Sequence, residues 1–183
     1  MPNQSFHYEV PNMSLVVQDK DMACWYASAR MLIDWRERQN RSMQCRGTDD
    51  TTVQLYKANN GIQNRQILPL AKRLGLESVP PMSPSVDALR DWLMRYGPLW
   101  TNGMRHIVVV AGIKGPVPIA GNALNYQVKV YDPWPGNGIT WRNLDGWYTG
   151  TNPQGFGASS RDAGPSVEAT FLHLPESAMG IRR

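Results

Sequence analysis

The chain has 183 residues, of which 42% are hydrophobic and 19% are charged. This balance is typical of a folded globular protein and excludes an intrinsically disordered one, and the length predicts a single domain over residues 1–183. Lys and Arg together number 19 against 15 for Asp and Glu, a formal net charge of +4. Because the basic residues are scattered and no nucleic-acid-binding motif accompanies them, we expect a solvated basic surface and no nucleic-acid partner.

The sequence excludes several other classes of protein. Two cysteines, Cys24 and Cys45, are too few for a disulfide framework or for a structural zinc site of the usual type. No run approaches the roughly 20 apolar residues that a membrane helix needs. The N-terminal segment lacks the basic and apolar parts of a Sec-type signal. We therefore expect no membrane association and no Sec-dependent export.

The first half of the chain has the periodicity of helices. Between Met22 and Gln39, apolar residues recur at spacings of three and four, which predicts an amphipathic helix. Asp19 or Asp21 stands where a helix N-cap or a first-turn carboxylate is expected. A polar stretch then interrupts the pattern, and three shorter helices are predicted at Thr51–Ala58, Asn64–Leu74 and Ser85–Tyr96.

After Gly97 the chain changes to short segments rich in Val, Ile and aromatic residues, which are typical of strands. The predicted strands are Leu99–Thr101, Ile107–Ile113, Tyr126–Tyr131 and Val167–Leu174, separated by turn-rich segments with many Gly and Pro residues. Helices followed by strands predict an α+β fold, in which an antiparallel sheet packs against a layer of helices.

Cys24 lies in the first turn of the long predicted helix. Unpaired backbone N–H groups and the helix dipole favour an anion at this end of a helix, and a thiolate in such a setting is a nucleophile. The alternative is that Cys24 is a small buried apolar residue at a helix start. A nucleophilic cysteine needs a base beside it, which distinguishes the two interpretations.

Three histidines are available as that base. We expect His7 to lie in a mobile N-terminal segment and His173 to be packed within the last predicted strand. His106 immediately precedes the apolar strand Ile107–Ile113, which can hold it rigidly against a facing helix terminus. His106 is therefore the favoured partner of Cys24, and a purely structural histidine is the alternative.

An imidazole base also needs an acceptor that orients it and stabilises its charged form. Asp132 directly follows the predicted strand Tyr126–Tyr131 and precedes a proline. If this strand and the one after His106 are antiparallel neighbours, Asp132 and His106 reach the same end of the sheet. The alternative is that Asp132 only forms an Asp-Pro turn.

The order of these residues resembles that of the papain-like cysteine proteases. Gln18 precedes Cys24 by six residues, and Cys24 and Trp25 open a helix, as in that family. The small bacterial branch, which includes secreted effector proteases of plant pathogens and the peptidase domains of bacteriocin exporters, is further resembled by Gly97-Pro98-Leu99, His106-Ile-Val-Val-Val-Ala-Gly112 and Val130-Tyr-Asp132-Pro133. The resemblance implies a papain-like α+β fold, with the nucleophile helix packed on an antiparallel β-sheet.

The resemblance also implies a role for each site residue. Cys24 would be the nucleophile and His106 the general base. Asp132, which stands where larger papains have Asn, would orient the imidazole, and Gln18 would donate to the oxyanion. The implied reaction is hydrolysis of peptide bonds in a protein substrate, with no metal or organic cofactor. Cys45 matches nothing in the motif, and we expect it to have no catalytic role.

A compact protease with neither propeptide nor signal peptide resembles bacterial effector and toxin domains. We therefore expect a protein secreted by a dedicated bacterial system, such as a type VI system, that acts in the cytoplasm of a target cell during interbacterial competition. Such domains are often the C-terminal part of a larger polypeptide and travel with a cognate inhibitory immunity protein. Two other functions stay open: a peptidoglycan amidase with the same Cys–His chemistry, and an inactive papain-like module that binds a peptide without cutting it.

Overall fold

The computed structural model describes residues 5–39, 48–79, 84–103, 106–118, 124–144 and 171–175. Within these residues the chain forms four helices and a seven-stranded antiparallel sheet, so the predicted α+β class is confirmed. The helices are α1 (Cys24–Arg38), α2 (Asp50–Ala58), α3 (Asn64–Leu74) and α4 (Val86–Tyr96). The strands are β1 (Phe6–Glu9), β2 (Glu77–Ser78), β3 (Leu99–Asn102), β4 (Ile107–Pro118), β5 (Leu124–Asp132), β6 (Gly138–Asn143) and β7 (Phe171–His173).

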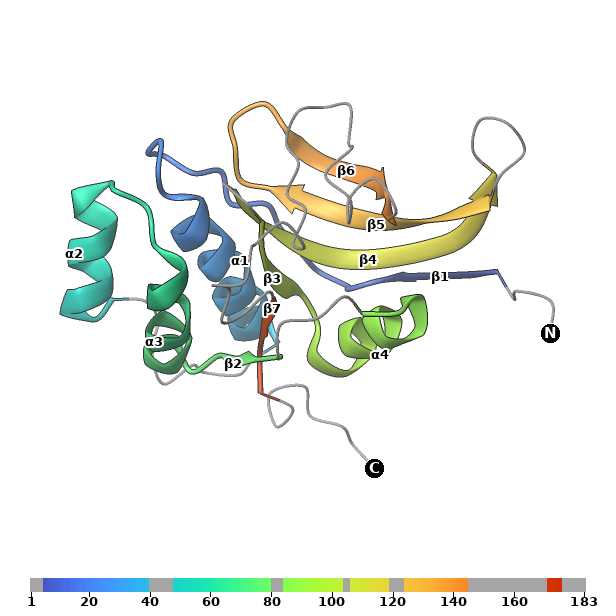
Figure 1. Cartoon of the computed structure of the whole chain (residues 1–183), viewed down its shortest axis with the longest axis horizontal. Coiled ribbons are helices and arrows are strands. Elements are labelled where there is room, and N and C mark those ends of the chain that lie inside the picture. The colour runs from blue at the N-terminus through green and yellow to red at the C-terminus, as the bar shows by residue number, and fades with distance from the viewer. Residues whose placement is uncertain are drawn as a thin grey trace.

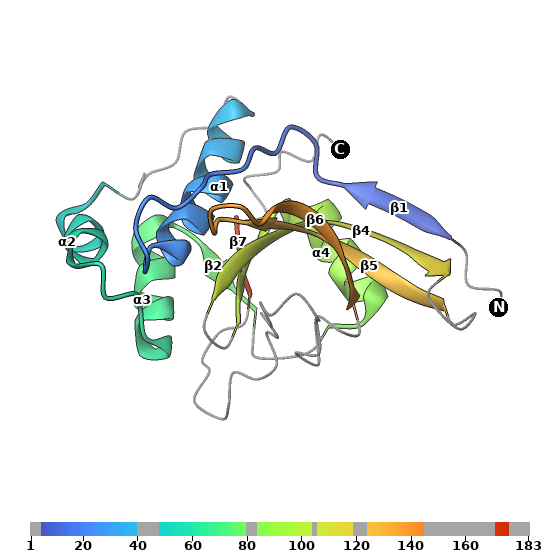
Figure 2. The same cartoon turned by 90° about the horizontal axis from the view of Figure 1, so that it is seen from above.

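The sheet is built around β4. The strand order is β2-β7-β3-β4-β5-β6, and β1 also pairs with β4. One edge of β4 pairs with β5, whereas the opposite edge pairs with β3 through residues 107–110 and with β1 through residues 112–115. Figures 1 and 2 show β4, β5 and β6 curving together on one side of the molecule, while α1, α2 and α3 gather on the other. The beginning of β4 lies between these two parts.

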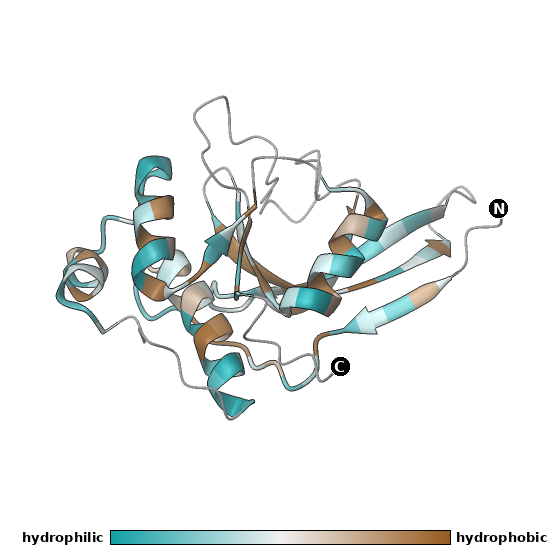
Figure 3. Ribbon diagram, turned by 90° about the horizontal axis from the view of Figure 1, so that it is seen from below, coloured by the Kyte–Doolittle hydropathy of each residue, from teal (hydrophilic) through white to brown (hydrophobic). Residues whose placement is uncertain are grey.

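Buried hydrogen bonds fix the start of α1 against the sheet. The Trp100 indole Nε1 on β3 donates to the carbonyl oxygen of Trp25 at 3.1 Å. The Ser28 hydroxyl donates to the carbonyl oxygen of Ile107 on β4 at 3.3 Å. All four residues are buried. Figure 3 shows apolar segments on the central strands and alternating apolar and hydrophilic segments along the helices, as expected for helices with one buried face.

Three of the predicted helices have nearly the predicted bounds because local residues cap them. Asp49 accepts a hydrogen bond from the Thr52 N–H at the start of α2 at 2.9 Å. Ser85 does the same for the Ala88 N–H at the start of α4 at 3.2 Å. Gly75 ends α3 in the left-handed conformation, with a φ of 67°. Such caps act over a few residues and can therefore be recognised in a sequence.

The prediction for the start of α1 was wrong in detail. The helix begins at Cys24, later than predicted, and neither Asp19 nor Asp21 caps it; the N-cap residue is Ala23, which makes no side-chain hydrogen bond to the helix. The Asp19 carboxylate instead accepts a hydrogen bond from the Tyr56 hydroxyl on α2. The Asp19 carboxylate, which the local sequence predicted as a helix cap, is thus used in a tertiary contact instead.

Strands β1, β2 and β6 were not predicted, and β4 and β5 are longer than predicted. The expectation of a mobile N-terminal segment was wrong for residues 6–9, because β1 pairs with β4 and places His7 opposite Lys114. β4 continues through Gly115 and Pro116 because a register shift between Lys114 and Val117 accommodates them. Pairing with neighbouring strands, rather than local preference, decides these elements.

Strand β7 agrees with the end of the strand predicted at Val167–Leu174, whose first residues lie outside the described part of the chain. Cys45 also lies outside the described residues, so the structure does not bear on its predicted lack of a role. Among the helices that the structure describes, none has both the length and the apolar character needed to span a bilayer.

Replacement of Trp100 by Phe should destabilise the protein, because it removes the donor to Trp25 and leaves space at a fully buried site. We expect the free energy of unfolding, measured by urea denaturation, to fall by about 1–3 kcal/mol. The matched change Trp134→Phe alters a side chain that is 37% exposed and should cost less than about 0.5 kcal/mol. Equal losses for the two variants would contradict an anchoring role for Trp100.

Candidate active site

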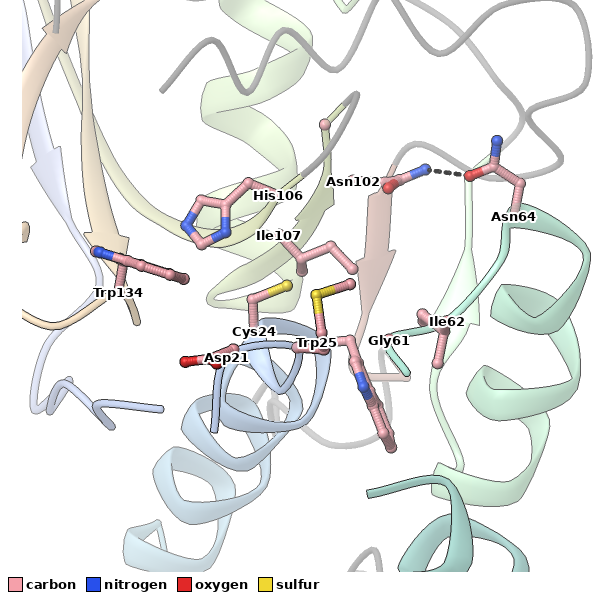
Figure 4. Close-up of a pocket in the computed structure, with 12 residues that line it drawn as sticks. Asp21, Cys24, Trp25, Gly61, Ile62, Asn64, Asn102, His106, Ile107 and Trp134 are labelled. Atoms are coloured by element: carbon pink, nitrogen blue, oxygen red, sulfur yellow. Dashed lines mark hydrogen bonds between the residues drawn. The ribbon is translucent and has the colours of Figure 1, made fainter. Parts of the chain in front are cut away.

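A cavity of about 510 Å³ lies where the helices meet the beginning of the sheet. It is lined by the loop before α1, the connection between α2 and α3, the end of β3 and the start of β4. Cys24, the first residue of α1, is half-buried at this cavity. Figure 4 shows its sulfur beneath the His106 ring, with Trp134 on one side and Ile62 and Asn64 on the other. The positive end of the α1 dipole therefore lies at the cavity.

The structure brings His106 and Asp132 together. His106 immediately precedes β4 and Asp132 ends β5, and the two strands pair antiparallel, with Val109 opposite Tyr131. The His106 Nε2 atom lies 2.7 Å from the Asp132 Oδ1 atom. Because Nε2 binds the carboxylate, Nδ1 is the ring nitrogen left to face Cys24.

The charge of His106 follows from these neighbours. Burial of the ring disfavours the imidazolium, but hydrogen bonds and electrostatic attraction from Asp132 and Cys24 outweigh burial and raise the pKa of His106 to about 9. The imidazole therefore carries a proton at neutral pH. A protonated imidazole beside a thiol can serve as the proton donor in acyl transfer.

Asp132 is fully buried and accepts four hydrogen bonds from the described residues. Its Oδ1 atom accepts from His106 and from the backbone N–H of Trp134 at 3.0 Å. Its Oδ2 atom accepts from Asn137 Nδ2 at 3.1 Å and from Arg142 Nη2 at 2.9 Å. Burial raises the pKa of the carboxyl, but these contacts outweigh burial and lower it to about 2. Asp132 is therefore ionised at neutral pH.

Gln18 is buried and is not among the described residues that line the cavity. Its Nε2 donates to the carbonyl oxygens of Lys20 at 2.8 Å and Asp21 at 3.0 Å. Its Oε1 is buried with no hydrogen-bond partner among the described residues. The backbone N–H of Gln18 donates to the Pro133 carbonyl oxygen at 2.8 Å. Gln18 thus ties the loop before α1 to the turn after β5, and its donation to an oxyanion stays a prediction.

The other two histidines lie elsewhere. His7, on β1, forms an exposed hydrogen bond with Glu9 at 2.8 Å. His173 is buried on β7 and stacks on the ring of Tyr96, with the ring centroids 3.9 Å apart, so the prediction that it is packed is confirmed. His106 is therefore the described histidine that faces Cys24.

The cavity wall formed by the connection between α2 and α3 is held by the loop before α1. Asn59 ends α2 in the left-handed conformation, and its Oδ1 accepts a hydrogen bond from the Met22 N–H at 3.0 Å. Gly61 has a φ of 71°, and a Cβ atom there would lie only 3.0 Å from the Met22 Cε atom. Because the Met22 Cε atom ends a flexible side chain, the positive φ is the feature that favours glycine at this position.

Residues 4–143 match the family of the papain-like cysteine protease AvrRpt2, a family of bacterial plant-pathogen effectors. The chain belongs to this family. The matched region contains Gln18, Cys24, His106 and Asp132 and ends with β6. The mixed helical and antiparallel architecture fits the papain-like α+β fold that the AvrRpt2 family implies. No curated protein matches the chain.

Sequence reasoning missed two residues of this AvrRpt2-family site, Asn137 and Arg142. Both bind Asp132 Oδ2, and both lie in or after a segment that its Pro and Gly residues mark as a turn. The run Ile139-Thr-Trp141 is rich in residues that favour strands and could have indicated β6. Even so, no local pattern shows that Arg142 meets a carboxylate on the neighbouring strand.

Asp132→Asn should lower the pKa of His106 from about 9 toward or below the ordinary value of 6.5, because burial then acts without the carboxylate charge. The titration of the His106 ring protons can be followed by NMR in both proteins. Asp34→Asn is the matched control, since it removes a carboxylate that pairs with Arg30 along α1. We expect this control to leave the His106 titration unchanged. Coinciding titrations for wild type and Asp132→Asn would contradict the described contact.

Proposed function

We propose that the protein is a cysteine endopeptidase that cleaves peptide bonds in target proteins. The observation that carries the proposal is that, in an AvrRpt2-family chain, Cys24 and His106 line one cavity and the buried Asp132 binds His106 from behind. A buried carboxylate orients an imidazole, which in turn faces a thiol at a helix N-terminus. This arrangement activates a cysteine nucleophile: the imidazole serves as the base, and the carboxylate orients the imidazole.

In the first half-reaction, the Cys24 thiolate attacks the carbonyl carbon of the scissile peptide. A carbon–sulfur bond forms, and the carbonyl oxygen takes on negative charge. When the carbon–nitrogen bond breaks, His106 donates its proton to the leaving amine and the acyl group stays on Cys24 as a thioester. Because its pKa is raised to about 9, His106 holds this proton throughout the neutral range.

In the second half-reaction, water attacks the thioester. His106, which is now neutral, takes a proton from the water as the new carbon–oxygen bond forms. The carbon–sulfur bond then breaks, the carboxylic acid product leaves, and the thiolate and imidazolium are restored. Asp132 stays ionised during both half-reactions and keeps the ring aligned.

The oxyanion is stabilised by the backbone N–H of Cys24 and by the Gln18 side chain. Because Gln18 is buried outside the cavity lining, its amide must turn toward Cys24 and exchange one of its hydrogen bonds to the carbonyl oxygens of Lys20 and Asp21 to reach the oxyanion. Loss of the Gln18 side-chain amide should reduce turnover by about 10²- to 10³-fold, the usual effect of removing one oxyanion donor. Part of that effect would come from the loop that Gln18 holds.

In the cell, the protein acts as a toxin delivered into the cytoplasm of another cell by a dedicated secretion system. Its membership of an effector family supports this part of the proposal. An active protease endangers the cell that makes it, so a cognate immunity protein covers the cleft of Cys24 and His106. With a formal net charge of +4 on the enzyme, an acidic inhibitor would associate quickly.

Cys24→Ala and His106→Ala should each abolish turnover, and the double variant should be no worse than either single one, because nucleophile and base act as one unit. Asp132→Ala should retain more activity, since His106 can still visit the productive orientation. Cys45→Ser is the control and should behave like wild type. Turnover is measured as new protein N-termini generated in a cell lysate, counted by mass spectrometry.

The same proteins also distinguish the two other functions. Products from purified sacculi, with none from lysate proteins, would identify a peptidoglycan amidase and contradict the proposal. If neither material is cleaved and Cys24 reacts with iodoacetamide no faster than free thiol, a peptide-binding module without catalysis is indicated.

Expression of the wild-type chain in the bacterial cytoplasm should slow growth, whereas Cys24→Ala should not, because damage requires the nucleophile. Growth curves at matched expression levels provide the measurement. Coexpression of a binding partner encoded with the protein should restore growth. If wild type and Cys24→Ala grow alike, both the toxin role and the need for an inhibitor are contradicted.

A further inference from the structure

Arg142 binds the oxygen of Asp132 that His106 does not use. Its Nη2 atom donates to Asp132 Oδ2 at 2.9 Å, whereas His106 lies against Oδ1. The two side chains of this ion pair are 4% and 0% exposed. A carboxylate this deeply buried is costly without a counter-charge. The guanidinium supplies that charge on the far oxygen and leaves the near one to the imidazole.

Packing alone does not explain an arginine at this position. Arg142 lies opposite Val128 in the sheet and is buried, while Asn143 beside it is exposed. An inward-facing position of a strand ordinarily takes an apolar residue. Arg142 Nε donates to Thr140 Oγ1 at 3.2 Å, and Nη1 is buried with no hydrogen-bond partner among the described residues. The contact that accounts for the guanidinium is the one with Asp132.

We propose that Arg142 is a positioning residue, which acts on His106 through Asp132: its guanidinium holds the carboxylate with Oδ1 aimed at the imidazole and partly offsets the negative charge that the imidazole faces. This inference rests on the proposed function for its importance to catalysis, although its effect on His106 can be measured without turnover. Arg142 comes from β6 and His106 from the start of β4, so the two charged groups that face Asp132 belong to different strands. Cys24, on α1, faces His106 from the helical side.

The charges of these four groups alternate in the reactive state: Cys24 thiolate, His106 imidazolium, Asp132 carboxylate and Arg142 guanidinium. The positive charge of Arg142 opposes the effect of Asp132 on His106. Without the guanidinium, the carboxylate acts on the imidazolium unopposed, so His106 should hold its proton more tightly. Loss of Asp132 should instead lower the pKa of His106. If Arg142 had a merely structural role, its replacement would leave the pKa of His106 unchanged.

The test uses the full chain with Cys45→Ser, so that Cys24 is its single cysteine. Arg142→Met removes the charge at similar length, and Arg142→Lys keeps it. Arg30→Met is the matched control, because Arg30 forms a half-buried ion pair with Asp34 on α1. The readouts are the NMR titration of His106, the pH dependence of Cys24 alkylation by iodoacetamide, and the thermal unfolding midpoint.

Arg142→Met should shift the His106 titration and the alkaline limb of the alkylation profile upward by about one pH unit. Arg142→Lys, which keeps the charge, should leave the His106 titration and the alkylation profile close to those of the wild type. Arg30→Met should change neither the titration nor the profile. If Arg142→Met does not fold, Arg142→Gln, which keeps donors for Oδ2 without the charge, should show the same direction of shift.

An unchanged or lowered His106 pKa in a folded, uncharged variant would overturn the inference. That result leaves the proposed function standing if wild type still cleaves proteins. Conversely, an upward shift together with a wild type that cleaves nothing would support the positioning role and contradict the protease. The two failures are therefore distinguishable.

Discussion

A single buried carboxylate holds the candidate site together. Asp132 accepts hydrogen bonds from His106 at the start of β4, from the turn that follows β5, and from Arg142 on β6. A buried charge without such partners would be very costly, so its burial is compatible only with a structure that supplies them. The turn must curl back over the carboxylate and β6 must present a cation inward. The direction and the charge of His106 follow from this arrangement.

Cys24 opens α1 and His106 directly precedes β4, and these two elements belong to different parts of the molecule (Figure 1). Separate contacts join those parts. Trp100 on β3 binds the first turn of α1, and the backbone of Gln18 binds Pro133 in the turn beside the carboxylate. Because both contacts are short and lie close to the cavity, the separation of Cys24 and His106 does not depend on one flexible loop. The helical part and the sheet thus meet at the cavity that Cys24 and His106 line.

Local sequence signals were sufficient wherever a few neighbouring residues decide the structure. Three predicted helices agree with the structure almost to the residue, and local features account for this: Asp49 and Ser85 cap α2 and α4, and Gly75 ends α3. Amphipathic periodicity located α1, and the apolar run after His106 located the start of β4. Strands β1 and β2 were not predictable in this way, because their short, mixed sequences become strands only by pairing with β4 and β7.

For the site itself, the sequence alone determined the candidate nucleophile, base and orienting acid, since Cys24 lies at the start of a predicted helix and His106 and Asp132 flank two predicted strands. That the two strands are neighbours came from the structure. Only the tertiary structure decided what surrounds them. Asn137 and Arg142 bind the carboxylate from across the sheet, and Gln18 uses its amide on the loop before α1. The physical reason is that periodicity and caps are local properties, whereas the partners of a buried charge are set by which distant segments the fold brings within hydrogen-bonding distance.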